Sequence, residues 1–155
     1  MGANTVSEVG PTRECGVVVS PLFEIARHRL RLAHDTLQEA DVLIAESRWR
    51  GALNRLYYAA FYSARALLAT RDLDSARHSG VIALFQQHFV KTGVVPATIG
   101  KVLPRSFETR QTSDDADVAD LHEEEVRQLR TDVVAFVATC ERVVEQLIAA
   151  DTNRT

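Results

Sequence analysis

The chain has 155 residues, 46% of them hydrophobic, and a formal net charge of −3 at pH 7, which fits a single globular domain. Its 7 glycines, 4 prolines and 6% aromatic residues exclude collagen-like, low-complexity and turn-rich β proteins. No apolar run approaches the ~18 residues of a membrane span, and the first residues lack the pattern of a signal peptide, so we expect a cytoplasmic protein that does not enter a membrane.

Residues 1–20 show no hydrophobic periodicity and are predicted to form a flexible N-terminal extension. A helix is predicted to follow, because Ser20 suits an N-cap and Pro21 the first helical position. Apolar side chains then recur at steps of three and four up to about residue 46, as in an amphipathic helix. They are Leu22, Ala26, Leu30, Ala33, Leu37, Ala40 and Ile44.

Two further helices are predicted in the middle of the chain. The first begins near Trp49, ends at residues 71–75 and carries small side chains that let another helix approach closely. The second runs from about residue 77 to residue 92, followed by Gly93, which suits a helix C-terminus. Its apolar face has the full helical spacing, with Val81, Leu84, Phe85, His88 and Phe89.

The last third of the chain begins with a short helix predicted over residues 96–103, which Pro104 should interrupt, and a further turn is predicted to follow to about Gln111. An acidic connection follows over residues 112–119, and a long terminal helix is predicted to begin after Asp120, leaving residues 151–155 as a tail. No segment alternates with the period of a strand. We therefore expect an all-α fold, an antiparallel bundle of four main helices plus a short helix, in one domain over residues 21–150.

Charge is distributed unevenly along this bundle. Residues 21–110 carry 13 basic and 8 acidic side chains, whereas residues 111–155 carry 4 basic and 11 acidic ones. A basic body suits phosphate binding, and an acidic last third suits a basic partner. The alternative is that both are ordinary solvated helix faces.

None of the common catalytic motifs is present: there is no glycine-rich phosphate loop, HExxH sequence or nucleophile elbow. The 5 histidines do not have metal-ligand spacing, and 2 cysteines are too few for a zinc knuckle or a disulfide framework. We therefore expect neither a metal nor a cofactor.

Two segments in the middle of the chain carry candidate polar groups. Asn54 lies on a helix beside Tyr57 and Tyr58 and predicts a polar network, since a buried amide needs hydrogen-bond partners. The alternative is an aromatic core stripe with hydroxyls at its rim. His78 lies at the start of the third helix, where an anion can bind, although it can equally be a capping or packing residue.

The third candidate is Arg110, which is followed at once by three carboxylates, Asp114, Asp115 and Asp117. The guanidinium can hold a phosphate, and a carboxylate can orient it or act as a base. The carboxylates can also bind Mg²⁺, as a metal-dependent phosphoryl enzyme would require. The alternative is a solvated acidic connector with one incidental ion pair.

These residues occur within segments that resemble the HEPN superfamily, above all the small stand-alone HEPN proteins encoded beside a minimal nucleotidyltransferase. The resemblance covers about residues 22–150. It is carried by Asn54-Arg55-x-Tyr57-Tyr58-Ala59-Ala60-Phe61, by Ala64-Arg65-Ala66-Leu67-Leu68, by His78-Ser79-Gly80-Val81-Ile82-x-Leu84-Phe85-x-x-His88-Phe89-Val90-Lys91-Thr92-Gly93 and by Arg110-x-x-Ser113-Asp114.

The resemblance implies a helical bundle, usually a homodimer, and in many members a metal-independent ribonuclease. Their motif is an Arg followed, after four to six residues, by a His that deprotonates a ribose 2′-hydroxyl. In toxin–antitoxin pairs the nucleotidyltransferase partner silences the HEPN toxin, in some cases by adding AMP to a tyrosine.

This chain departs from the family motif at the histidine. The window after Arg110 holds Asp115, Ala116 and Asp117 instead, and Asp115 also occupies the position of the acceptor tyrosine. Arg29–His34 fits the spacing by chance, and Arg71–His78 is a reserve candidate.

Two functional hypotheses follow from the residues and the resemblance. The first is an RNA-acting toxin of a HEPN–nucleotidyltransferase module with a degenerate motif, in which Arg110, Asp114 and His78 are catalytic and Asn54, Tyr58 and Asp115 support them. The second is a non-catalytic HEPN module that dimerises and docks a nucleotidyltransferase or binds nucleotide or nucleic acid.

Overall fold

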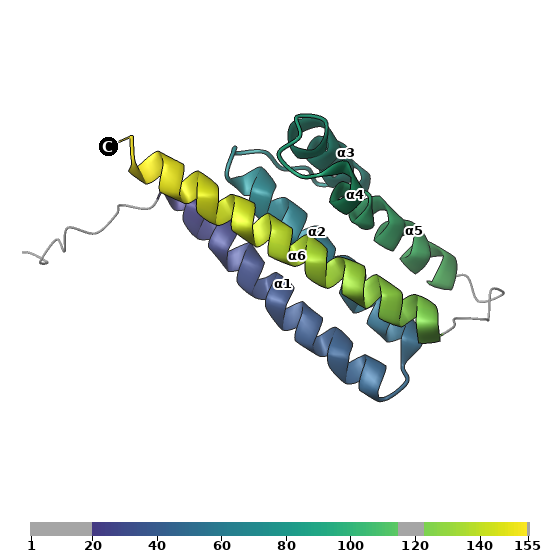
Figure 1. Cartoon of the computed structure of the whole chain (residues 1–155). Coiled ribbons are helices and arrows are strands. Elements are labelled where there is room, and N and C mark those ends of the chain that lie inside the picture. Colours follow the sequence, from purple (N-terminus) through teal and green to yellow (C-terminus); the bar gives the residue numbers. More distant parts are fainter. Residues whose placement is uncertain (1–19, 115–122, 155) are drawn as a thin grey trace, which may run out of the picture.

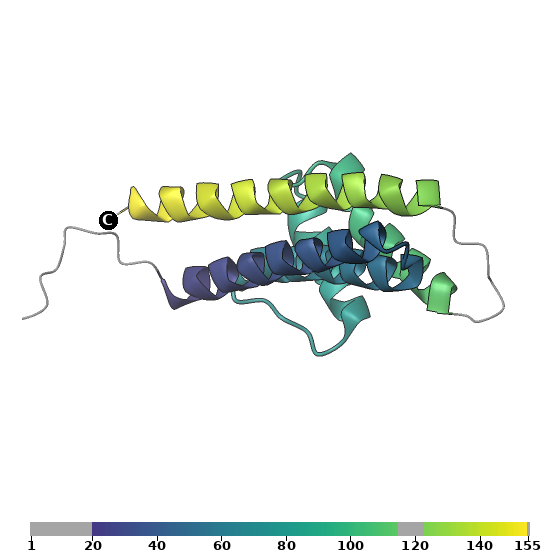
Figure 2. The same ribbon diagram turned by 90° about the horizontal axis from the view of Figure 1, so that it is seen from below.

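The computed structural model describes residues 20–114 and 123–154, and within these ranges its regular structure is helical, without a strand. Three long helices form the body: α1 (Pro21–Ala45), α2 (Trp49–Ala69) and α6 (Glu123–Thr152). In Figure 1, α1 runs antiparallel to both α2 and α6, and the shorter helices lie on the side away from α1. Figure 2 shows α1 and α6 side by side from below. The predicted all-α helical bundle is confirmed.

Helix α1 begins where its sequence predicts. The Ser20 side-chain oxygen accepts a hydrogen bond of 3.3 Å from the Leu22 N–H, and Pro21 is the first helical residue. The buried side of the helix carries Phe23, Ala26, Leu30, Ala33, Ala40 and Ile44. This apolar stripe packs against α2, and burying such a stripe is the main source of helix stability in a protein.

Helix α2 is the centre of the bundle, because 13 of its 21 residues are buried. It packs against α1, α3, α5 and α6. Many of its buried side chains are small, which lets these neighbours approach closely. They include Ala52, Ala59, Ala60, Ser63, Ala64 and Ala66. Helix α2 therefore lies between α1 on one side and α3 and α5 on another (Figure 1).

The third predicted helix is present, but it is not uniform. It consists of α3 (His78–Phe85) followed directly by a π-helical turn, η1 (Gln86–Val90). The side-chain amide of Gln86 donates a 3.0 Å hydrogen bond to the Gly100 carbonyl, and a Cβ on Gly100 would lie only 2.6 Å from Val90 Cγ2. The widened turn thus coincides with unusually close packing of a neighbouring segment, a contact that the periodicity of residues 77–92 does not encode.

The predicted interruption at Pro104 is wrong. The short helix is α4 (Ala97–Gly100), the break falls at Lys101, and Pro104 lies in the first turn of α5 (Val102–Asp114). An N–H in a first turn has no acceptor within its helix, so a proline there costs no hydrogen bond. Helix α5 also continues through residues 112–114, which were predicted to belong to the acidic connection, so Arg110 and Asp114 share one helix. Asp115 and the predicted N-cap Asp120 lie outside the described residues.

In the part of the chain that the structure describes, none of the helices is long and apolar enough to cross a membrane. Cys140, on α6, is fully buried, and this burial raises the pKa of its thiol far above the ordinary value.

Candidate functional site

Tyr57, on α2, contacts two of the candidate residues predicted from the sequence, His78 and Arg110. Its side chain is fully buried, and its hydroxyl oxygen lies 2.8 Å from Nδ1 of His78, the first residue of α3. The guanidinium carbon of Arg110, on α5, lies 5.2 Å from the centre of the same tyrosine ring. The fold therefore brings His78 and Arg110 together on one aromatic side chain.

Arg110 is held by aromatic rings on one helix and by a carboxylate on its own. Its guanidinium carbon is 5.2 Å from the ring centres of both Tyr57 and Tyr58, within range of a cation–π interaction. Its Nε atom lies 3.7 Å from Oδ2 of Asp114, one turn along α5, and is buried without a hydrogen-bond partner. Among the described residues, the two rings and Asp114 orient the guanidinium, and no hydrogen bond from its terminal nitrogens is present, which suits a group that receives an anionic oxygen.

The imidazole of His78 packs flat against Phe61, with ring centres 4.6 Å apart and planes 25° apart. Desolvation by burial lowers the pKa of His78, and the positive charges of Arg110 and Arg65 lower it further. Because its ordinary pKa is 6.5, this imidazole is neutral at pH 7. A neutral imidazole can accept a proton, as a general base must.

The hydrogen bond to the Tyr57 hydroxyl decides whether Nε2 of His78 is free to act as a base, because it fixes which ring nitrogen carries the proton. Burial raises the pKa of Tyr57 well above the ordinary tyrosine value, so its phenol stays protonated. When Nδ1 carries the ring proton and donates it to the phenol oxygen, Nε2 is left as the acceptor. When the phenol donates to Nδ1 instead, Nε2 carries the proton, so the hydrogen bond couples Tyr57 to the tautomer of His78.

The predicted supporting residues divide into two groups. Tyr58 belongs to the cluster, since it also meets the His78 ring edge-on, with ring centres 5.9 Å apart. The Asn54 side-chain oxygen accepts hydrogen bonds from Nε and Nη2 of Arg55, and the Arg55 guanidinium in turn lies 5.1 Å from the Tyr58 ring centre. Asn54 therefore reaches the cluster only through Arg55.

The spacing-based alternatives do not form pairs. Arg29 donates to the Arg65 carbonyl oxygen, whereas His34 pairs with Glu141 on α6. The guanidinium carbon of Arg71 lies 4.4 Å from the Phe89 ring centre, and this side chain donates to the His88 carbonyl oxygen. His78 thus has Arg110 and Tyr57 as its neighbours, not Arg71.

A cavity of about 490 Å³ opens beside His78. Its lining comes from α2, from the segment before α3 and from α3 itself, with Phe61, Arg65, Asp74, Ser75, Ala76 and His78. Arg65 Nη2 donates a 3.0 Å hydrogen bond to Asp74 Oδ2. Sequence reasoning missed Arg65 and Asp74, because only the path of the chain between α2 and α3 brings them together.

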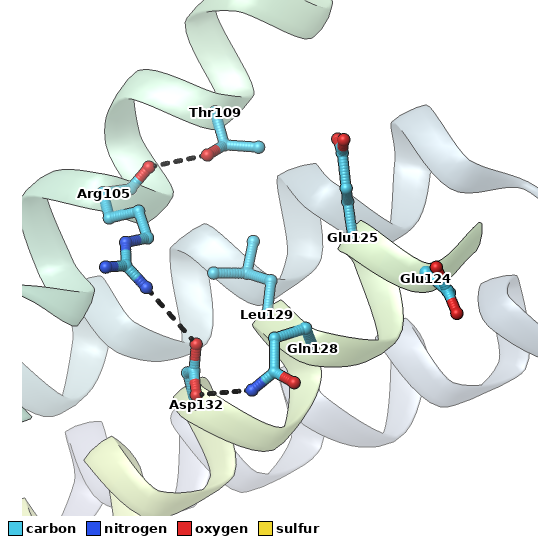
Figure 3. Close-up of a pocket in the computed structure, with 7 residues that line it drawn as sticks. All are labelled: Arg105, Thr109, Glu124, Glu125, Gln128, Leu129 and Asp132. Atoms are coloured by element: carbon cyan, nitrogen blue, oxygen red, sulfur yellow. Dashed lines mark hydrogen bonds and ion pairs between the residues drawn. The ribbon is translucent and has the colours of Figure 1, made fainter. Parts of the chain in front are cut away.

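A second cavity, of about 520 Å³, lies between α5 and α6 (Figure 3). It contains three carboxylates, those of Glu124, Glu125 and Asp132, and one guanidinium, that of Arg105, which is 3.6 Å from Asp132. Of the predicted site residues that the structure describes, none lines it. Its negative charge disfavours a phosphate. In residues 20–114 and 123–154 no group of three or more histidine, cysteine or acidic side chains is placed to hold a metal ion.

Comparisons with known proteins agree on one family. A family model described as the HEPN domain matches residues 26–143. The chain is 37% identical over 124 residues to a UPF0332 protein of Thermotoga maritima, a match that spans 80% of this chain and 94% of that protein. It is 35% identical over 85 residues to a Methanocaldococcus jannaschii protein named "Putative toxin", spanning 55% of this chain and 63% of that protein. A second protein of that organism with the same description is 29% identical over 97 residues, spanning 63% of this chain and 66% of that protein.

Proposed function

The chain belongs to the HEPN domain family, and we propose that it is the RNA-cleaving toxin of a two-component toxin–antitoxin module. The family match and the two archaeal relatives whose names carry the word toxin support a toxin-like HEPN protein. The observation that carries the catalytic part is the convergence of His78 and Arg110 on Tyr57. The base, His78, comes from α3 and the cation, Arg110, from α5. In the family motif, by contrast, the Arg and the His are separated by four to six residues in one segment.

The proposed reaction needs no metal. The reaction uses the tautomer in which Nδ1 of His78 donates to the Tyr57 oxygen. Nε2 of this neutral imidazole takes the proton of a ribose 2′-hydroxyl, and the 2′-oxygen attacks the adjacent phosphorus. The bond from phosphorus to the 5′-oxygen breaks, and that oxygen takes a proton from water. The products are a 2′,3′-cyclic phosphate and a 5′-hydroxyl. Arg110 stabilises the negative charge that develops on the phosphate oxygens.

The proposed partners follow from the family resemblance. A homodimer would place two such sites beside one RNA strand, and a minimal nucleotidyltransferase would be the antitoxin. Because Asp115 stands at the position of the acceptor tyrosine, we propose that this partner inhibits by docking rather than by adding AMP at that position.

The test is expression of the full chain alone, with growth and total RNA followed after induction. Arg110→Ala and His78→Ala are each compared with a matched control that changes an exposed residue of α1, Arg31→Ala and His28→Ala. We expect the parent chain and both controls to arrest growth and fragment RNA. Loss of a general base or of a charge-stabilising donor costs about 10²- to 10³-fold in rate, so both site variants should leave RNA intact.

Purified protein then tests the chemistry. Cleavage should persist in EDTA and yield 2′,3′-cyclic phosphate ends. Normal growth and intact RNA with the parent chain would contradict the proposal. They would favour a non-catalytic HEPN module, an alternative that the 3.7 Å ion pair between Arg110 and Asp114 also supports, since a carboxylate beside the guanidinium competes with a phosphate.

A further inference from the structure

The cavity beside His78 contains charged groups that the proposed reaction does not use. We call it the Arg65 pocket, defined by Phe61, Arg65, Asp74, Ser75, Ala76 and His78. We propose that it binds the phosphate group of a nucleotide, next to the phosphate that reacts at Arg110. This inference deepens the proposed function and rests on it, because a strand held at His78 brings a neighbouring nucleotide to the pocket.

The Arg65 pocket has an excess of positive charge around its carboxylate. Arg65 and Arg29 both face the single carboxylate of Asp74, with N–O distances of 3.0 Å and 3.6 Å. Burial lowers the pKa of Arg29, and the positive charge of Arg65 lowers it further. Two guanidiniums that repel each other across one carboxylate leave a net positive charge, which a bound anion would neutralise.

The guanidinium of Arg65 has hydrogen-bonding capacity that the described residues do not use. Towards the residues that the structure describes, its guanidinium donates one hydrogen bond, from Nη2 to Asp74, so that Nη1 remains for a ligand, while the unpartnered Nε is buried. Its guanidinium carbon lies 5.8 Å from the Phe61 ring centre, so the group is packed in place. A fixed guanidinium with free N–H groups is the side chain best suited to a phosphate.

The Arg65 pocket lies at the beginning of α3. The N-cap residue of this helix, Arg77, makes no side-chain capping hydrogen bond, so the first N–H groups of α3 gain no acceptor from it. Ser75 packs on the first turn so closely that a Cβ on Gly80 would lie 2.0 Å from its hydroxyl oxygen. The partial positive charge of this helix end therefore adds to that of Arg65 in the same cavity.

The carboxylate in the pocket does not make it a cation site. Asp74 accepts hydrogen bonds from Arg65 and from the Ser75 N–H and lies beside Arg29. Burial raises the pKa of Asp74, but these hydrogen bonds and arginine charges outweigh it and leave the pKa below its usual value. The carboxylate is therefore ionised and already engaged by protein donors.

His78 links the pocket to the proposed reaction centre. It lines the Arg65 pocket, and its Nδ1 bonds to Tyr57, against which Arg110 packs. The charges of Arg110 and Arg65 both act on its imidazole. A strand whose reacting phosphate contacts Arg110 therefore passes His78 and reaches Arg65 with a neighbouring phosphate.

The experiment measures binding of three probes to the full chain by calorimetry: inorganic phosphate, uridine 5′-monophosphate and a pentauridylate with 2′-O-methyl groups, which cannot be cleaved. The variants are Arg65→Gln, Asp74→Asn and the exposed control Arg31→Gln, each checked for folding by circular dichroism. We expect Arg65→Gln to weaken binding about tenfold, the usual effect of losing a charged hydrogen-bond donor. It should also reduce the salt dependence of pentauridylate binding by about 0.7 in the log–log slope.

Asp74→Asn separates a phosphate site from a structural role. This variant keeps the shape of the side chain and an oxygen for the Ser75 N–H, but it removes the negative charge beside Arg65. Phosphate binding should therefore tighten severalfold. If Asp74→Asn weakens binding as Arg65→Gln does, the pair only maintains the fold and the inference is wrong. Unchanged binding in Arg65→Gln would also overturn it.

The probes identify the source of the phosphate and separate this inference from the proposed function. Tighter binding of the pentauridylate than of the mononucleotide supports a strand; equal binding supports a free nucleotide. In one outcome, RNA stays intact while Arg65→Gln weakens phosphate binding and Asp74→Asn tightens it. This result supports the phosphate pocket and contradicts the ribonuclease activity. If RNA is cleaved and Arg65→Gln changes neither binding nor KM, the ribonuclease stands and the pocket does not.

Discussion

The hydroxyl oxygen of Tyr57 lies 2.8 Å from Nδ1 of His78, although the two residues belong to different helices. The tyrosine is fully buried, whereas the histidine is only partly buried. The hydrogen bond therefore anchors a partly exposed imidazole to the centre of the bundle. An anchored imidazole presents its second nitrogen in one direction, which a base in a preorganised site requires.

Tyr57→Phe tests this anchor. The ring, and with it the contact to Arg110, is retained, and only the hydroxyl is lost. We expect RNA cleavage to fall about tenfold and the free energy of unfolding to fall by about 1 kcal/mol, the usual net value of a hydrogen bond. Cleavage assays and urea denaturation measure the two effects. Tyr62→Phe, a partly buried tyrosine of the same helix, is the control and should leave cleavage unchanged.

The pH dependence of cleavage should follow the lowered pKa of His78. Only the neutral imidazole is a base, so the rate should rise with pH, with a midpoint below the ordinary histidine pKa of 6.5, and then level off. Arg110→Lys keeps the positive charge and should keep the midpoint low. Arg110→Ala removes a charge that lowers this pKa, so its residual rate should have a higher midpoint.

The lowered pKa of His78 also makes the free energy of unfolding depend on pH. The folded chain binds the His78 proton less readily than the unfolded chain, so this histidine favours folding above pH 6.5 and loses that effect as the pH falls. An NMR titration of the imidazole nitrogens gives the pKa directly. A midpoint at or above 6.5 in the parent chain would contradict both the rate prediction and the stability prediction.

Most of the fold follows from local sequence signals. Ser20 and Pro21 begin α1, and the apolar spacing of this helix gives most of its buried face, from Ala26 to Ile44. The π-helical turn at residues 86–90 escaped prediction because it accompanies a tertiary contact, that of Gly100 with Val90. The position of Pro104 was misjudged because a proline interrupts a helix interior but fits a first turn equally well.

Less of the candidate site can be predicted from the sequence. Asn54 and Tyr58 precede Arg110 by about a third of the chain, and nothing local predicts that Arg110 packs on Tyr58 while Asn54 bonds to Arg55. Resemblance to a family singled out Arg110 and His78, but their meeting on Tyr57 depends on how α3 and α5 pack against α2. Arg65 lies in a segment that carries the resemblance, but the sequence assigned it no role, because its partner Asp74 lies in an irregular segment.

Gly100→Ala tests the close approach of α4 to η1. The added Cβ would lie 2.6 Å from Val90 Cγ2 and 3.0 Å from Cγ1, and a branched valine cannot swing away as a long side chain can. We expect a loss of about 1–3 kcal/mol in the free energy of unfolding, as for other overpacked cores. Adding Val90→Ala should recover part of this loss. A single variant as stable as the parent chain would contradict the packing argument.

Asp114→Asn decides between two roles for the carboxylate beside Arg110. The 3.7 Å separation, the spacing of one helical turn and the 52% exposure of Asp114 indicate a residue that positions the guanidinium. Loss of such a surface pair changes the free energy of unfolding by less than about 0.5 kcal/mol. Removing its negative charge should also strengthen RNA binding. We therefore expect KM to fall while kcat falls only a few fold.

A proton-accepting Asp114 predicts a different result for the same variant, a loss of kcat of about a hundredfold or more with KM little changed. Steady-state kinetics on a short RNA substrate separates the two outcomes, with Asp35→Asn as the matched control because Asp35 is an exposed carboxylate on α1. A hundredfold loss would move the proton transfer from His78 to Asp114. A fall in KM with a modest loss of kcat would leave His78 as the base and show that the Arg110–Asp114 pair competes with the RNA phosphate, as its geometry implies.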